Sequence, residues 1–168
     1  MFTDAICLLL FPALMAFAAA SDLFTMTISN RVAVGLVAGF FLVAGITGMS
    51  AAAIGSHVGA GAAVLVVGFV CFARGWIGGG DAKLAAATAL WFGFDQMFNY
   101  LVWASLIGGV LTLLMLQFRR LPLPDLWARQ EWVMRLHRAD AGVPYGIALA
   151  TAALLVYPQT VFMQSVGL

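Results

Sequence analysis

Two aspartates, Asp22 and Asp81, are the residues of this chain that point most directly to chemistry. Each lies at one end of a long apolar segment, where an ionisable side chain is costly and marks a candidate functional site. Two carboxylates that share one water can hydrolyse a peptide bond, because the ionised acid takes a proton from the water while the protonated acid polarises the carbonyl. The pair titrates as a unit, so the sequence does not assign the proton to either residue.

A run of three glycines comes immediately before Asp81: Gly78, Gly79 and Gly80. Glycine adopts backbone conformations that other residues avoid and lets a second backbone approach closely. We therefore expect the run to leave space for an extended substrate strand. Taken alone, Asp81 is also explained as a helix N-cap, and Asp22 as a helix cap or a partner of Arg31. Both acids at one membrane depth, next to the glycines, favour the catalytic interpretation.

The composition is that of an integral membrane protein. Of the 168 residues, 64% are hydrophobic and 9% are charged, whereas soluble domains carry about 25% charged residues. The net charge of +1 gives a nucleic-acid partner no electrostatic support. The cysteines and histidines are isolated and lack metal-ligand spacing, so we expect no metal and no cofactor. The N-terminus has no Lys or Arg in its first residues, which indicates a retained first transmembrane helix rather than a signal peptide.

Six apolar segments must position the two acids. They cover residues 5–24, 32–48, 54–73, 82–96, 97–118 and 143–162, and most approach the roughly 20 residues of a membrane-spanning helix. The fourth is short for a full span, even when it continues through Gln96. We therefore predict an all-α membrane protein with six transmembrane helices, folded as a single domain over residues 1–168.

The basic residues predict the orientation. All eight of them lie in the loops 22–31, 74–83 and 119–142, which share one side of the six-helix arrangement: Arg31, Arg74, Lys83, Arg119, Arg120, Arg129, Arg135 and Arg138. The positive-inside rule then makes these loops cytoplasmic and puts both termini on the periplasmic side. Asp22 and Asp81 consequently lie at the same cytoplasmic depth.

The loop 119–142 is the longest polar segment. Pro122 and Pro124 keep its start out of a helix, and residues 125–138 are predicted to form a short helix. That helix either lies on anionic lipid headgroups or acts as a solvated, positively charged anchor. Lys83 either reaches the headgroups or places a positive charge near the two acids.

Three ordered motifs resemble those of the type IV prepilin peptidases, which are membrane aspartic proteases. Residues 78–84 resemble the family's GxGD signature with its following Lys83. Residues 21–31 resemble the region around the first catalytic acid, with Ile28-Ser29-Asn30 in place of the usual Ile-Pro-Asn. Val143-Pro144-Tyr145-Gly146 resembles the element that opens the last helix.

The resemblance implies a multi-pass enzyme of the bacterial inner membrane that cleaves the basic leader of prepilins and pseudopilins at the cytoplasmic face. It implies Asp22 and Asp81 as the catalytic pair. It also implies supporting roles in the motif and substrate groove for Gly78, Gly79, Gly80, Lys83, Asn30, Pro144, Tyr145 and Gly146. The chain lacks the cytoplasmic insertion of the larger members that also methylate the new N-terminus. It is similar in size to the minimal TadV or CpaA peptidases of Tad/Flp pilus systems, so we expect cleavage of Flp-type prepilins without methylation.

Other classes of protein remain open at this point. One is a presenilin-like GxGD protease, although such enzymes usually carry a Tyr before the first acid, where this chain has Ser21. Another is a small transporter that uses the acids as proton relays, and a third is a non-enzymatic pilus assembly factor. For the substrate leader, Asp125, Glu131 and Asp140 are candidate contacts.

Overall fold

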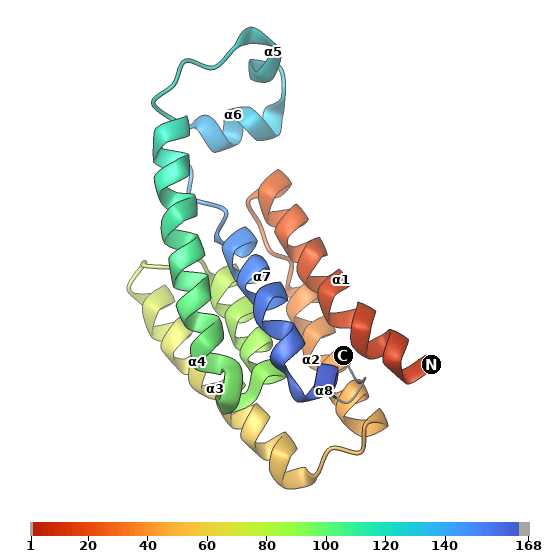
Figure 1. The fold of residues 1–168 in the computed structure, drawn as a ribbon. Helices are drawn as coiled ribbons and strands as arrows, with labels where there is room; N and C mark the ends of the chain where they lie inside the picture. The colour runs from red at the N-terminus through yellow and green to blue at the C-terminus, as the bar shows by residue number, and fades with distance from the viewer. Residues whose placement is uncertain (1, 165–168) are drawn as a thin grey trace.

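The computed structural model describes the backbone of residues 2–164 and the side chains of residues 5–164, and in that part the chain is a bundle of helices without strands (Figure 1). The helices are α1 (Phe2–Thr25), α2 (Asn30–Ile46), α3 (Ala51–Ala73), α4 (Gly79–Phe118), α5 (Asp125–Ala128), α6 (Glu131–His137), α7 (Tyr145–Val156) and α8 (Val161–Gln164), with a 3₁₀ turn at Tyr157–Gln159. Two of the long helices have serine N-caps, because Ser29 and Ser50 accept backbone hydrogen bonds at the starts of α2 and α3.

Three helices are long and apolar enough to cross a membrane: α1 over Ala5–Thr25, α3 and α4. The helices Asn30–Ile46 and Tyr145–Gln159 are apolar but shorter. The all-helical membrane class is therefore confirmed. The count of six spans and the side of each terminus stay predictions.

Helix α4 is broken at Gly93, which has φ 60° and ψ −176°. The chain folds back there, so that the ring of Tyr100 lies 5.2 Å from that of Phe92 and Leu101 packs against the cluster of Val64, Ala86 and Ala89. The expected boundary between residues 96 and 97 is thus wrong by a few residues. Gly93 makes the turn because glycine accepts a positive φ that L side chains rarely adopt.

His57 completes the hydrogen bonding at this break. The last carbonyls of a helix have no partner within it, and an unpaired carbonyl is costly inside a membrane. The Nδ1 atom of His57 lies 2.8 Å from the carbonyl oxygen of Leu90. Since a carbonyl only accepts, Nδ1 carries the hydrogen and donates. His57, which is 8% exposed, therefore belongs to the structure of the turn.

The apolar core lies away from the two acids, towards the other end of the bundle. Trp91 is fully buried and its Nε1 donates to the carbonyl of Leu36 on α2, at 2.8 Å. The ring of Phe11 on α1 lies 5.0 Å from Trp91 and stacks on Tyr157 at 4.4 Å. These contacts join α1, α2, α4 and the end of α7, and so fix the elements that carry the acids.

The segment 119–142 forms two short helices instead of the one expected over residues 125–138, since α5 ends at Ala128 and α6 begins at Glu131. Helix α6 packs at the end of α1 (Figure 1). Arg135 donates to the carbonyl of Phe24 at 2.8 Å, and the Trp132 ring lies 5.4 Å from the Phe24 ring. A cation at a helix C-terminus is favourable because it complements the helix dipole.

Candidate active site

Asp22 lies in the last turn of α1 and is only 5% exposed. Its Oδ2 atom accepts a hydrogen bond of 2.6 Å from the backbone N–H of Gly146, the second residue of α7. The first N–H groups of a helix lack partners within it and attract negative charge. Asp22 therefore caps the start of another helix, α7, and the structure places no ion pair between Asp22 and Arg31 within the described residues.

Asp81 is the third residue of α4, which has Gly78 as its N-cap. Its carboxylate has a backbone hydrogen bond with Gly78. An acid at the third position that reaches back to the N-cap N–H forms half of a capping box. Asp81 is therefore not itself the N-cap that the sequence suggested, but it contributes to the cap from the third position of the helix. This contact occupies one carboxylate oxygen and is compatible with a second role for the other.

The structure brings the two acids together in one cavity of about 770 Å³. They are close enough for the charge of Asp22 to act on Asp81. The cavity is formed where α1, both halves of α4 and the two loops before α4 and α7 meet. Its other lining residues are Met26, Gly75, Trp76, Ile77, Gly78, Thr112, Gly142, Val143 and Tyr145.

Packing within the chain explains the three glycines. A Cβ atom on Gly78 would lie 2.8 Å from Oδ2 of Asp81, and one on Gly79 would lie 3.2 Å from the ring of Phe72. A Cβ atom on Gly80 would lie 3.2 Å from Cβ of Ile28. The run therefore allows the loop after α1 and the end of α3 to approach the start of α4. This is a different reason from the space for a substrate strand that the sequence suggested.

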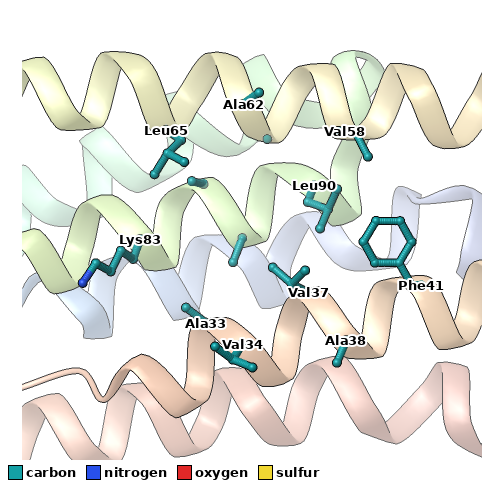
Figure 2. A pocket seen from close by; sticks show the side chains of 13 residues that line it. Ala33, Val34, Val37, Ala38, Phe41, Val58, Ala62, Leu65, Lys83 and Leu90 are labelled. Carbon is teal, nitrogen blue, oxygen red and sulfur yellow. The ribbon is translucent and has the colours of Figure 1, made fainter.

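Lys83 faces away from the two acids. It lies two residues after Asp81, which is about 200° further round a helix of 3.6 residues per turn. Its Nζ donates to Oδ1 of Asn30 at 2.9 Å. Lys83 lies at one end of an apolar groove of about 560 Å³ between α2, α3 and the first half of α4 (Figure 2). The two supporting residues Lys83 and Asn30 thus pair with each other outside the acid cavity.

Of the predicted element Pro144-Tyr145-Gly146, the last two residues lie at the acid site. Pro144 is the N-cap of α7, Tyr145 lines the cavity and Gly146 binds Asp22. The ring of Tyr145 lies on Gly108 of the second half of α4, where an added Cβ would approach Tyr145 Cζ to 2.8 Å. A methyl group on Gly146 would lie 2.8 Å from Asp22 Oδ2. Both positions therefore require glycine for close approach.

Six lining residues carry no signal in the sequence that assigns them to the site: Met26, Gly75, Trp76, Ile77, Thr112 and Gly142. Trp76 is 69% exposed and has the Arg74 guanidinium 5.6 Å from its ring centroid. It gives the cavity an aromatic rim. Among the described residues, no group of three or more His, Cys, Asp or Glu side chains is arranged to hold a metal ion.

Asp95 provides a contrast to the two acids. It lines a separate cavity of about 460 Å³ with His57, Thr47 and Phe162. That cavity lies beside the turn at Gly93, away from the start of α4. Asp95 is therefore an acid of the same chain that takes no part in the Asp22–Asp81 site.

Comparison with known proteins gives one finding. A sequence model of the type IV leader peptidase family matches residues 9–113. The matched range includes Asp22, the glycine run and Asp81, and it ends before Pro144. No curated protein and no solved structure matches the chain significantly.

Proposed function

The chain belongs to the type IV leader peptidase family, and we propose that it is an aspartic endopeptidase that uses Asp22 and Asp81 to remove the leader of Flp-type prepilins. Family membership makes it a leader peptidase of the membrane in general terms. The observation that carries the finer proposal is that the two acids, which lie far apart within the matched range, line one cavity.

In the proposed reaction, one water bridges the two carboxylates. The ionised acid takes a proton from this water, whose oxygen then attacks the scissile carbonyl, while the protonated acid donates a hydrogen bond to the carbonyl oxygen. The C–N bond of the tetrahedral intermediate then breaks, and the leaving nitrogen takes the proton that the first acid had accepted from the water. The backbone supports Asp22 from Gly146 and Asp81 from Gly78, so each acid keeps a second oxygen for the water.

The proposed setting is the bacterial inner membrane, with six spans, both termini periplasmic and the acids at the cytoplasmic face. The substrate would place its apolar helix in the bilayer and its basic leader in the cytoplasm. The absence of a large cytoplasmic insertion supports cleavage without methylation. Of the acids considered for the leader, Asp140 forms an ion pair of 2.6 Å with Arg138, which lowers the pKa of Asp140 through the hydrogen bond and the nearby charge. Because Asp140 is already paired, Asp125 and Glu131 are the better candidates for contact with the basic leader.

The test is co-expression of the chain with a Flp-type prepilin, followed by separation of precursor and mature pilin on a gel. Asp22→Asn and Asp81→Asn keep the size of the side chain but remove its ability to ionise. Both variants should accumulate full-length prepilin, whereas wild type and the control Asp95→Asn should produce mature pilin. Normal cleavage by either active-site variant, at equal expression, would refute the two-carboxylate mechanism.

A further inference from the structure

We propose that Ile28 is a positioning residue that sets the separation of Asp22 and Asp81. The role in catalysis rests on the proposed function, but the spacing itself is a property of the fold. Ile28 lies in the loop between α1 and α2 and does not line the acid cavity. Its effect on the acids must therefore pass through the two helix starts that it contacts.

The first contact is with the start of α4. A Cβ atom on Gly80 would lie 3.2 Å from Cβ of Ile28 and 3.6 Å from its carbonyl oxygen. Gly80 is the residue directly before Asp81. The Ile28 backbone and Cβ therefore set how closely the start of α4 can approach the loop.

The second contact is with the start of α7. A Cβ atom on Gly146 would lie 2.8 Å from Cδ1 of Ile28 and 2.8 Å from Oδ2 of Asp22. The N–H of the same glycine donates to that Oδ2 atom. One side chain is thus packed between the backbone that precedes Asp81 and the backbone that binds Asp22.

The loop holds Ile28 in this place from both sides. Met26 has a positive φ of 56°, and its N–H donates to the carbonyl of Asp22 at 2.8 Å. Ser21 donates to the carbonyl of Thr27 at 2.9 Å. On the far side, Asn30 is held by Lys83 at 2.9 Å, which gives this pair a role as a tie between the loop and α4.

Truncation of Ile28 to alanine removes the Cδ1 contact with Gly146 and keeps the Cβ contact with Gly80. It should therefore change the distance between the acids and leave the cavity wall intact. Two groups that must share one water tolerate little displacement, and a misplacement of about 1 Å can cost about 100-fold in rate. Ile28→Ala should lower kcat by about 10- to 100-fold with little change in KM, because Ile28 does not touch the substrate. Ile28→Leu keeps both Cβ and a methyl group at the δ position, so it should recover most of the rate.

Ile54 is the matched control for lost packing. It is also half-buried and packs against the core, but it lies on α3 at the end near the turn between α2 and α3. Ile54→Ala removes the same atoms and should leave kcat close to that of wild type. Equal kcat losses in Ile28→Ala and Ile54→Ala would overturn the positioning role, as would a loss confined to KM.

A second measurement tests the spacing without any cleavage assay. The full chain carries Asp22→Cys and Asp81→Cys in a background of Cys7→Ala and Cys71→Ala, and is treated in membranes with thiol crosslinkers of graded length. Replacing Ile28 by Ala should shift or broaden the range of linker lengths that join the two positions, and replacing Ile54 by Ala should not. An unchanged range in the Ile28→Ala background would overturn the inference. This result is independent of whether a prepilin is cleaved, so it separates failure of the inference from failure of the proposed function.

Discussion

Asp22 accepts a hydrogen bond from the backbone N–H of Gly146, 124 residues further along the chain. This bond joins the end of α1 to the start of α7 at the cavity that also contains Asp81. It means that a residue outside the matched family range holds one of the two proposed catalytic acids. The last long apolar segment is therefore part of the site as well as of the bundle.

Gly146→Ala should abolish most of the leader cleavage, because the added methyl group would lie 2.8 Å from Asp22 Oδ2 and must displace the carboxylate. We expect a loss of at least about 100-fold in rate, the cost of a misplacement near 1 Å. The control is Gly45→Ala on α2, where an added Cβ meets nothing within 4 Å. Rates of prepilin cleavage in membranes measure the difference, and equal rates for the two variants would contradict this role of Gly146.

The adjacent glycines of α4 offer a matched pair. A Cβ atom on Gly108 would overlap the ring of Tyr145, whereas one on Gly109 meets nothing within 4 Å. Gly108→Ala should displace Tyr145 from the cavity wall and slow cleavage, and Gly109→Ala should be neutral or slightly stabilising, because alanine favours a helix by about 1 kcal/mol over glycine. Cleavage rates and thermal unfolding in detergent test both. A neutral Gly108→Ala would show that the position of Tyr145 does not matter.

Trp76 is expected to contact the substrate at the rim of the acid cavity. Trp76→Ala should raise KM for prepilin and change kcat much less, because the ring is exposed and carries no group that takes part in the proposed reaction. Trp127→Ala is the control, since Trp127 is also exposed but does not line the cavity. If both variants have the KM of wild type, the rim has no part in substrate binding.

His57 should contribute to stability and not to catalysis. Its ring donates to the Leu90 carbonyl at the break of α4, and leaving a buried carbonyl unpaired costs about 1–3 kcal/mol. His57→Ala should lower the unfolding temperature in detergent while cleavage at low temperature persists. His57→Asn retains a donor and should recover part of the loss. A stable but inactive His57→Ala protein would instead place His57 in the reaction.

The sequence was sufficient to predict the class of the fold and the meeting of Asp22 with Asp81. Long apolar segments predict membrane helices, and the distribution of the basic residues along the sequence predicts that both acids lie at one depth. The sequence was not sufficient to predict the turn at Gly93, because a single glycine within an apolar run is equally compatible with close helix packing. The hydrogen bond from Gly146 and the contacts of Ile28 depend on distant backbone approaches, which no local pattern records.

The structure of the loop 119–142 was also predicted only in part from the sequence. Its prolines correctly predicted an irregular start, and α5 begins directly after Pro124. Tertiary contacts hold α6 and the segment after it in place: Arg119 donates to the carbonyls of Leu136 and Gly142, and Arg135 donates to the carbonyl of Phe24. Arginines that the positive-inside rule counts only as charges thus also act as hydrogen-bond donors to helix ends.

The central claim is that Asp22 and Asp81 act as one catalytic pair, and a double-mutant cycle on the purified full-length protein tests it most directly. Single-turnover cleavage of a Flp-type prepilin is measured for wild type, Asp22→Asn, Asp81→Asn, the double variant and Asp95→Asn. If the acids share one water, either substitution removes the mechanism, so both single variants and the double variant should have the same residual rate, and Asp95→Asn should match wild type. Losses that multiply in the double variant, or a single variant that cleaves at the rate of wild type, would contradict the account.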